Sequence, residues 1–574
     1  MRPVRSLAAL IVALCLTAVA GARTIPHDTL RWTILDRNGD NKLEYAAGEP
    51  RLARNELAAS SAPRARALLA FAHFADTQMV DEESPGRVEL VDFIGGDPFS
   101  ASYRPQEGLM PHVLNEQVRE VRALTRAPAT GSPIRLVMTG GDNGDNAQLN
   151  EVRWFIDVLD GGKVVNPNSG RAGTCSLKRQ PVYRGMRGGG RFYEPNGRGD
   201  GPGYSPSMAA NRRSAGRSSA VRDFPGLFEQ MNRPFRPVGL GSIPWYAVYG
   251  NHDALVQGNF AQNELFDRVA TSCRKVTRYS PDALAQVRPL LAGGVTADER
   301  AEIIRITFGD FLDTWGVPRE HRGLWTTVPS DPSRRFLRKS AWIREHFTTR
   351  GRPRGHGFTQ ANVASGEAHY SFSPAAGVRF VVVDTAADNS SSGNVDDAQF
   401  RWLATQLTIA EARREVVLVF GHHSLRTLNA PGTNVNDGAA VEGLLRDHPA
   451  VVAYVAGHEH RNRIEPHGTF WELVSASHLE WPQQSRVIEL AQLQDGTIAI
   501  YATVIDHLAS ARPPSRRQRS SGVQTANEVL RLASIARELS LNEPQAENGE
   551  NGWPDRRGTR LDRNVALLVP NPYP

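Results

Sequence analysis

The chain has little cysteine and no strong excess of either charge. Of its 574 residues only 3 are cysteine, and 67 Lys+Arg against 61 Asp+Glu give a net charge of +6. No run of like charge is long enough to form a polybasic tail, so we expect no nucleic-acid partner. After residue 20 no stretch is apolar enough for a membrane helix, so we expect no transmembrane segment once an N-terminal signal is removed.

Common catalytic motifs are also missing. The sequence has no Gly-x-Ser-x-Gly elbow, which argues against a serine hydrolase. It has neither a P-loop nor a His-Glu-x-x-His zinc motif. With 40% hydrophobic and 22% charged residues, the chain can still bury a large core and is neither disordered nor collagen-like.

The N-terminus has the features of a secretory signal. Arg2 and Arg5 precede an apolar run at residues 7–20, which is short for a bilayer span and ends in the small-x-small pattern Ala-Val-Ala. We predict a signal peptide at residues 1–20 and an exported protein, periplasmic or extracellular. An uncleaved anchor and a lipid anchor at Cys15 are the alternatives.

Removal of the signal would leave Cys175 and Cys273. In an oxidising compartment an even pair favours one disulfide, which here would close a long loop. Two unpaired thiols are the alternative, because a sequence does not report the distance between them.

Short apolar runs recur along the chain, and they are rich in Val, Ile and Phe, as buried strands are. They cover residues 68–75, 134–139, 245–249, 378–383, 416–420 and 451–456. Helix-like stretches lie between several of them, at residues 111–125, 150–159, 397–412 and 441–447. This alternation predicts an α/β core, in which ligands bind at the carboxyl ends of the strands.

The same pattern suggests a domain organisation. We expect a polar lead-in at 21–64, a catalytic domain at 65–510 and a C-terminal extension at 511–574 that holds one helix (526–539) and a polar tail. Two insertions interrupt the domain: 161–243, irregular and rich in Gly, Pro, Ser and Arg, and 254–364, helical, with a capping box at Thr296 and Glu299. Residues 36–44 partly match a calcium loop, but a hairpin turn explains them better.

Polar clusters follow the predicted strands. They are DTQ (76–78), GDNGDN (141–146), GNHD (250–253), GHH (421–423) and GHEH (457–460). A core does not require charged and imidazole groups at every strand end. Oxygen and nitrogen donors without thiolate suit Mn, Zn, Fe or Mg, and so many of them could hold two ions.

The order of these clusters, D-x-(H/Q), G-D-x-x-(D), G-N-H-(D/E), H and G-H-x-H, resembles the calcineurin-like metallophosphoesterase superfamily from about residue 66 to 507, outside both insertions. Segments such as DTQMVDEESP and SHLEWPQQSRVIEL are similar to an exported bacterial branch of that superfamily with no established substrate. The resemblance implies a four-layer α/β/β/α sandwich, with two β-sheets packed together and flanked by helices.

The resemblance also implies a site with two divalent metal ions. Asp142 would bridge them, and the remaining ligands would be Asp76, Gln78 and His460 for one ion and Asn251, His422 and His458 for the other. His252 would sit beside the scissile phosphate, as proton donor to the leaving oxygen or as a charge stabiliser. Asp145, Asn146 and Asp253 are interpreted as groups that fix loops or ligands, and His423 as the alternative to His422.

Two positions depart from the commonest pattern. Gln78 stands where histidine is usual, which would bias that ion towards harder metals such as Mn²⁺ or Mg²⁺. Asp145 stands where purple acid phosphatases have a tyrosine, so a ferric enzyme of that type is not expected. Outside the motifs, His73 is interpreted as a core histidine. Arg104, His356, His478 and Arg486 could approach a phosphate, although a surface or structural role explains each of them.

These observations predict an exported dinuclear phosphoesterase. It would hydrolyse a phosphate mono- or diester, in a phosphorylated small molecule or headgroup, by attack of a metal-bridging hydroxide. The rival interpretation is a catalytically silent metal-binding scaffold on the same fold, with the insertions as its interaction surface. The sequence leaves the substrate and the oligomeric state open, and both interpretations predict the same metal site.

Overall fold

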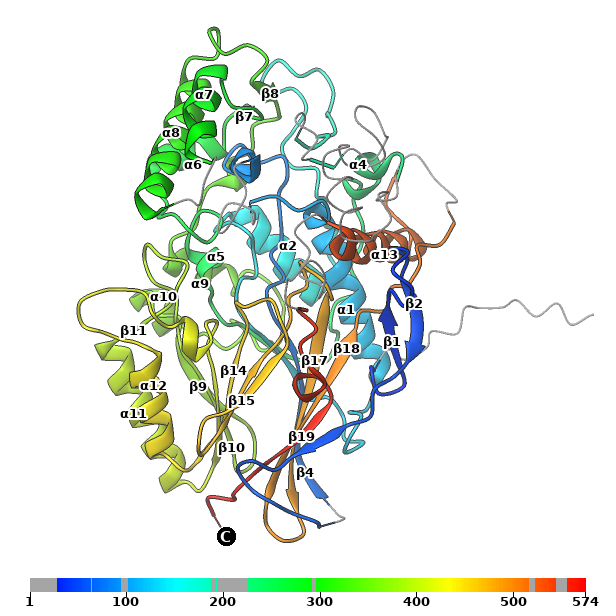
Figure 1. Ribbon diagram of the computed structural model, residues 1–574, viewed down its shortest axis with the longest axis vertical. Coiled ribbons are helices and arrows are strands. Elements are labelled where there is room, and N and C mark those ends of the chain that lie inside the picture. The colour runs from blue at the N-terminus through cyan, green and yellow to red at the C-terminus, as the bar shows by residue number, and fades with distance from the viewer. Residues whose placement is uncertain are drawn as a thin grey trace, which may run out of the picture.

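The computed structural model describes residues 28–62, 65–93, 102–186, 192–193, 224–291, 296–515, 522–543 and 555–573. Two large β-sheets form its centre, and helices lie around them (Figure 1). The predicted signal peptide lies outside the described residues. Within them, no helix combines the length and the apolar character that a membrane crossing requires.

The first sheet has seven strands in the order β3-β19-β18-β17-β4-β5-β6. Their bounds are Leu52–Arg54, Val565–Val569, Ile498–Asp506, Gln484–Leu493, Ala65–Phe74, Leu136–Thr139 and Trp245–Tyr246. β4, β5 and β6 run parallel, so their carboxyl ends share one edge of the sheet.

The second sheet has six strands in the order β15-β16-β14-β12-β10-β9. Their bounds are Arg463–Pro466, Trp471–Val474, Val451–Ala456, Val416–Phe420, Val378–Val382 and Tyr370–Ala375. β10, β12, β14 and β16 are parallel. β10, β12 and β14 are buried along their whole length, as strands covered on both faces must be.

The two sheets pack face to face through aromatic side chains. Phe71 of β4 lies 5.1 Å from Phe380 of β10 and 5.8 Å from Phe420 of β12, between ring centroids. The indole N–H of Trp471 donates to the carbonyl of Leu568 at 3.0 Å and so joins β16 to β19. The strands of both sheets therefore share one core.

The helices lie around the two sheets. Their bounds are α1 Met110–Leu124, α2 Leu149–Asp160, α4 Leu227–Met231, α5 Asn251–Ala254, α6 Glu264–Ala270, α7 Pro281–Leu290, α8 Ala297–Gly316, α9 Lys339–Glu345, α10 Gln360–Ser365, α11 Asp397–Ala412, α12 Gly438–Asp447 and α13 Ala526–Asn542. Leucines of α11 and α12 pack against the second sheet in a separate apolar cluster. α1 and α2 contribute to the main core beside the first sheet, and α13 packs on α1. The predicted mixed α/β fold is confirmed.

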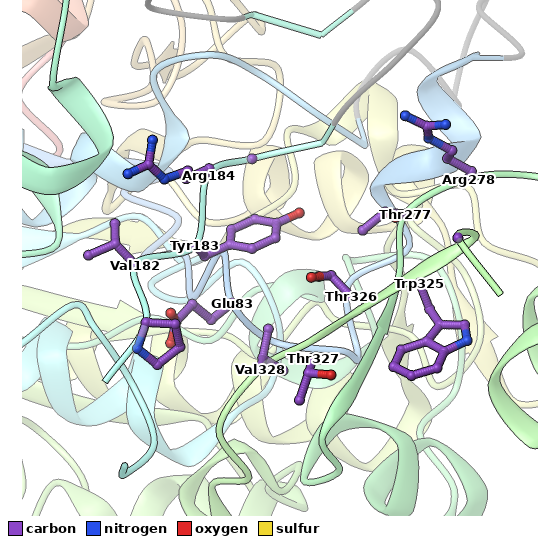
Figure 2. Close-up of a pocket in the computed structure, with 13 residues that line it drawn as sticks. Glu83, Val182, Tyr183, Arg184, Thr277, Arg278, Trp325, Thr326, Thr327 and Val328 are labelled. Carbon is purple, nitrogen blue, oxygen red and sulfur yellow. The ribbon is translucent and has the colours of Figure 1, made fainter. Parts of the chain in front are cut away.

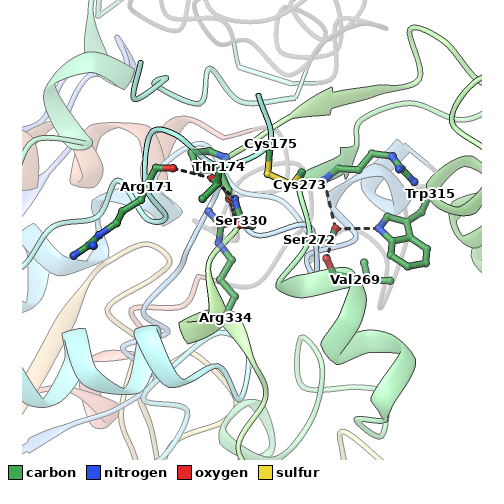
Figure 3. Close-up of a disulfide and its surroundings, with 11 residues drawn as sticks. Arg171, Thr174, Cys175, Val269, Ser272, Cys273, Trp315, Ser330 and Arg334 are labelled. Atoms are coloured by element: carbon green, nitrogen blue, oxygen red, sulfur yellow. Dashed lines mark hydrogen bonds between the residues drawn. A yellow bond between two sulfur atoms is a disulfide. The ribbon is translucent and has the colours of Figure 1, made fainter. Parts of the chain in front are cut away.

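The two predicted insertions meet in the structure. Cys175 of the first and Cys273 of the second form the expected disulfide, with Cα atoms 5.8 Å apart and 98 residues of separation (Figure 3). The second insertion is helical, as predicted, and α6, α7 and α8 lie together at one end of the molecule (Figure 1). It also contains a hairpin that the sequence pattern did not predict, made of β7 (Arg274–Val276) and β8 (Trp325–Thr327).

The ends of the chain contribute more structure than expected. We expected helix and coil after residue 511, but β19 pairs with β18 in the first sheet, because its apolar residues Val-Ala-Leu-Leu-Val are covered there. β3 of the lead-in pairs in turn with β19. Residues 36–44 form the expected turn, between β1 (Trp32–Leu35) and β2 (Glu44–Ala47). A further two-stranded pair joins β11 (Val395–Asp396) to β13 (Val435–Asn436).

Candidate metal centre

The polar clusters predicted at the strand ends come together where the parallel strands of both sheets end. Backbone hydrogen bonds connect them directly. The N–H of Gln78 donates to the carbonyl of Asp142 at 2.9 Å, and the N–H of Gly457 donates to the carbonyl of His422 at 3.0 Å. The backbone N–H of His458 donates to the Asp76 carboxylate at 3.0 Å, which connects the two sheets. The convergence expected from strand order is therefore present.

Left-handed backbone conformations turn these side chains towards one another. Asp76, Gln78, Asp142, His458 and His460 all have φ between 41° and 67°. Such values are uncommon for residues other than glycine, and they gather at functional sites because the surrounding structure must hold them in place.

Glycines in the motifs allow the clusters to approach closely. A Cβ atom on Gly250 would lie 2.2 Å from the Asp142 carboxylate, and one on Gly141 would lie 2.5 Å from the His422 ring. Both approaches are too short for any side chain. The glycine that precedes Asp142 and the one that precedes Asn251 are therefore required by packing around the site.

One group of candidate ligands consists of Asp76, Asp142 and His460, whose donor atoms lie within 4.8 Å of one another. His460 Nε2 is 3.4 Å from Asp76 Oδ1. Gln78 lies in the same cavity, and its buried Oε1 has no hydrogen-bond partner among the described residues. A buried amide oxygen without a partner is costly, and a divalent cation would satisfy it.

A second group contains His422, His423 and His458. The Nδ1–H of His422 donates to the carbonyl of Gly140 at 2.7 Å, which directs Nε2 at Asp142 Oδ2, 3.1 Å away. Asn251 Oδ1 lies 2.9 Å from the same Nε2. Two oxygen acceptors and a ring nitrogen thus face one point, which is the arrangement that a cation ligand set requires.

The electrostatics of the site reflect this crowding of donors. Burial alone would lower the pKa of His422, but the Asp142 carboxylate outweighs it and raises that pKa to about 9. Burial and the neighbouring His422 lower the pKa of His458 to about 3. Burial opposes ionisation of Asp142, yet His422 and His252 hold its pKa far below the usual range. Asp142 is thus an anion between imidazoles, and this donor set fits divalent cations.

His423 has other partners. The Thr385 hydroxyl donates to its Nδ1 at 2.9 Å, and its Nε2–H donates to the carbonyl of Ser391 at 2.9 Å. Both ring nitrogens are therefore occupied by protein groups. This geometry favours His422 over His423 as a ligand, and the ligand set itself stays a prediction.

His252 lies at the edge of the donor clusters, in the short helix α5. Its backbone N–H donates to Asp142 Oδ1 at 2.8 Å, and its Nδ1–H donates to the carbonyl of Asp145 at 2.7 Å. The ring therefore presents Nε2 to the cavity, where it is within reach of a substrate.

The other flanking residues fix loops. Asp253 accepts backbone N–H groups of Asn143, Gly144 and Gly250, which ties the GDNGDN turn to the GNHD turn. Burial and the nearby Asp142 raise the pKa of Asp253 to about 7. Asn146 Oδ1 accepts the backbone N–H of Gln257 at 2.8 Å. These contacts agree with the interpretation of both as groups that position their neighbours.

Two positioning groups were not predicted. Glu480 accepts the Nδ1–H of His460 at 3.1 Å and pairs with Arg556 at 2.9 Å. Arg87, almost completely buried, pairs with Asp145 at 3.0 Å. Glu480 lies in SHLEWPQQSRVIEL, a segment in which the sequence indicated possible phosphate contacts for His478 and Arg486 but no role for Glu480.

A cavity of about 320 Å³ opens at these groups and is lined by residues of several elements. Among the sequence candidates for phosphate contact, Arg104 lines it. His356 instead stacks on Trp245 at 3.6 Å. His478 is bonded to Ser485, and Arg486 donates to backbone carbonyls of the C-terminal segment. His73 is bonded to Ser475 in the core, as expected.

A second cavity, of about 350 Å³, lies where the two insertions meet (Figure 2). Tyr183, Thr277 and Trp325 line it together with three charged residues, Glu83, Arg184 and Arg278. None of the candidate metal ligands lines this cavity, so it is separate from the metal centre.

Comparison with known proteins gives one sequence relative of note. A 113-residue stretch is 30% identical to the "Manganese-dependent ADP-ribose/CDP-alcohol diphosphatase" of Xenopus tropicalis and covers 19% of this chain and 31% of that protein. This similarity is consistent with a calcineurin-like metallophosphoesterase. The chain thus matches about a third of the length of that relative, and no family model matches the chain.

Two solved structures overlap with this one. A dimetal phosphatase from Danio rerio is 13% identical, with a TM-score of 0.32, over 77% of this chain and 100% of that one. A sulfate thiohydrolase from Thermus thermophilus is 10% identical, with a TM-score of 0.26, over 78% of this chain and 58% of that one. At scores of this size neither overlap bears on the activity.

Proposed function

We propose that this protein is an exported phosphoesterase that uses two divalent metal ions. The observation that carries the proposal is the convergence of both donor clusters and His252 on one cavity. Asp142 would be shared by the two ions. Asp76, Gln78 and His460 would hold one ion, and Asn251, His422 and His458 would hold the other.

The donor set supports this division. Asp142 lies in the group with Asp76 and His460, and its Oδ2 also lies 3.1 Å from Nε2 of His422. A carboxylate can hold two cations about 3.5 to 4 Å apart, as two-metal hydrolases require. The ions, when bound, would activate water and neutralise charge on the phosphoryl oxygens.

The chain's own residues would supply the remaining chemistry. His252 Nε2 would give a proton to the leaving oxygen, while Nδ1–H remains bonded to the carbonyl of Asp145. Arg87 would hold the Asp145 carboxylate in place through their ion pair. Glu480 would hold the ring plane of His460, as carboxylates commonly do for metal-bound histidines.

The substrate class we propose is a phosphate mono- or diester in a phosphorylated small molecule or headgroup. The name of the Xenopus relative makes Mn²⁺ the first metal to test, with Zn²⁺, Fe²⁺ and Mg²⁺ as alternatives. Export is supported by the N-terminal signal pattern and by the disulfide. The mass of the mature protein tests cleavage after Ala20, and a retained N-terminus would contradict it.

Hydrolysis of p-nitrophenyl and bis-p-nitrophenyl phosphate, before and after chelation and with each metal restored, tests the activity. Asp142→Asn should lower kcat/KM by more than the roughly 10- to 100-fold that loss of an outer-shell partner causes. Asp437→Asn, at the carboxylate that caps α12, is the control and should leave turnover unchanged. Absence of hydrolysis with every metal and a broad panel of phosphate esters would favour the scaffold interpretation.

A further inference from the structure

The cavity at the metal centre has an apolar wall beside its polar floor. Val88, Val91, Phe260 and Phe308 line it together with the candidate metal ligands. Phe308 belongs to α8 and Phe260 to the loop after α5, so both rings come from the second insertion. Each of these two rings is only partly buried.

Buried residues hold the wall in place. The rings of Phe260 and Phe308 meet edge to face at 4.8 Å, and Phe266 lies behind Phe308 at 6.1 Å in a second edge-to-face contact. The N–H of Val256 donates to the carbonyl of Phe260 at 2.8 Å. Aromatic pairs in this arrangement prefer defined positions, so the wall is preorganised before a ligand arrives.

The loop that carries Phe260 directly follows the short helix α5, which carries His252. Gly258, with φ of 69°, lies against the His252 ring, where a Cβ would be 2.3 Å from Cδ2. Gln257 accepts the N–H of Val88 at 2.8 Å and donates to the carbonyl of Ser102 at 3.2 Å. The proton donor and the apolar wall are thus fixed relative to each other by one short, well-anchored segment.

We infer that this wall binds the organic part of the leaving group, so that the preferred substrates are phosphate esters whose leaving alcohol carries an aromatic or apolar group. The inference rests on the proposed function, in which His252 protonates the leaving oxygen. A general acid must lie about 2.6–3.2 Å from that oxygen, so the substituent on it begins beside His252.

The size of the cavity sets the size of that group. At about 320 Å³ it is near the lower end of the range for ligand pockets, roughly 300–1,000 Å³. A phosphoryl group with one ring fits this space better than a long chain. Ser102, Asn259 and Ser391 line the same cavity and could bond polar atoms on the ring.

Two non-hydrolysable inhibitors separate the wall from the metal centre. Phenylphosphonate and methylphosphonate present the same anionic head and differ only in the ring, and neither P–C bond is a substrate for ester hydrolysis. With Mn²⁺-loaded wild-type protein and p-nitrophenyl phosphate as the reporter substrate, we expect the inhibition constant of phenylphosphonate to be about tenfold lower than that of methylphosphonate.

Phe260→Leu and Phe308→Leu should remove most of this preference and leave inhibition by methylphosphonate within about twofold of wild type. Leucine keeps apolar volume, so these variants should fold where alanine could fail. The same variants should lower kcat/KM for phenyl phosphate more than for ethyl phosphate. Phe400→Leu on α11, also partly buried but outside the cavity, is the control.

Equal inhibition of the wild type by both phosphonates, or an unchanged preference in both phenylalanine variants, would overturn the inference while ester hydrolysis still supports the proposed function. Parallel weakening of both phosphonates would also overturn it, because the substitutions would then act on the metal centre. If neither phosphonate binds and no phosphate ester is hydrolysed, the proposed function is overturned and this inference with it.

Discussion

Glu480→Gln tests whether a carboxylate outside the ligand set controls metal binding. Glu480 is 6% exposed and accepts the Nδ1–H of His460 at 3.1 Å. Glutamine keeps the volume and one acceptor oxygen but removes the charge that orients the ring and raises its basicity. Loss of such a partner costs about 10- to 100-fold in metal affinity, or roughly 1.4–2.7 kcal/mol.

The substitution also acts on stability, and the two effects must be separated. Glu480 pairs with Arg556 and accepts from Nε of Arg104 at 2.6 Å, and removal of one partner of a buried ion pair costs about 3–5 kcal/mol. The matched control is Glu489→Gln, because Glu489 is also buried and accepts the backbone N–H groups of Ala129 and Thr130, outside the cavity.

Calorimetric titration of metal-free protein with Mn²⁺ measures the effect. In the proposed arrangement only the ion held by His460 should weaken, so one of two dissociation constants should rise 10- to 100-fold while the other changes less than about threefold. Glu489→Gln should lower Tm without changing either constant. Wild-type affinity at both sites in folded Glu480→Gln would refute the reasoning, whatever happens to Tm.

Two further expectations follow from contacts elsewhere. Gly258→Ala should lower kcat by at least about tenfold, because the new Cβ would displace the His252 ring. The positive φ of Gly258 should cost only about 1 kcal/mol of stability. Kinetics measures the first effect and thermal unfolding the second, and an unchanged kcat would contradict the close approach. Burial lowers the pKa of His112 to about 4, although its bond to Gln524 opposes this. The unfolded imidazole titrates near 6.5, so its contribution is present above that pH and is lost as pH falls towards 4. Between pH 7.5 and 5 this lowers the free energy of unfolding by about 2 kcal/mol. His112→Gln should therefore make the free energy of unfolding, measured with denaturant, less sensitive to acid. The same pH dependence in the variant and the wild type would refute this.

Local pattern predicted much of the central fold. β12 and β14 match the predicted strands residue for residue, because continuous β-branched and aromatic runs have few alternatives to a buried parallel strand. The predicted strand at 245–249 ends instead at Tyr246, because the next residues bond to other segments: the N–H of Ala247 donates to the carbonyl of His356. β19 was not predicted: it lies outside the alternation of strands and helices, and its pairing with β18 depends on tertiary contact.

The candidate site also contains residues that the sequence could predict and residues that it could not. Residues such as Asp142 and His422 could be found because their motifs lie directly after strands, and strand order alone brings those ends together. Glu480 and Arg87 contact His460 and Asp145, which lie in other parts of the sequence, so no local motif assigned either of them a role. A positioning residue is defined by the side chain it touches, and that contact exists only in the folded chain.

The second insertion shows why the sequence could indicate a metal site but not the substrate preference that we propose for it. Lys275 is completely buried, and its Nζ donates to the carbonyls of Glu82 and Ser84, in the segment that follows Gln78. An ammonium buried so deeply is stable only when its hydrogen bonds are satisfied, so this contact fixes the insertion against the segment that follows Gln78. The insertion is therefore built onto the site, and it brings Phe308 to a cavity whose floor comes from the ends of core strands. The capping box marks this segment as helical in the sequence, whereas the effect on substrate choice that we propose depends on where the core anchors it.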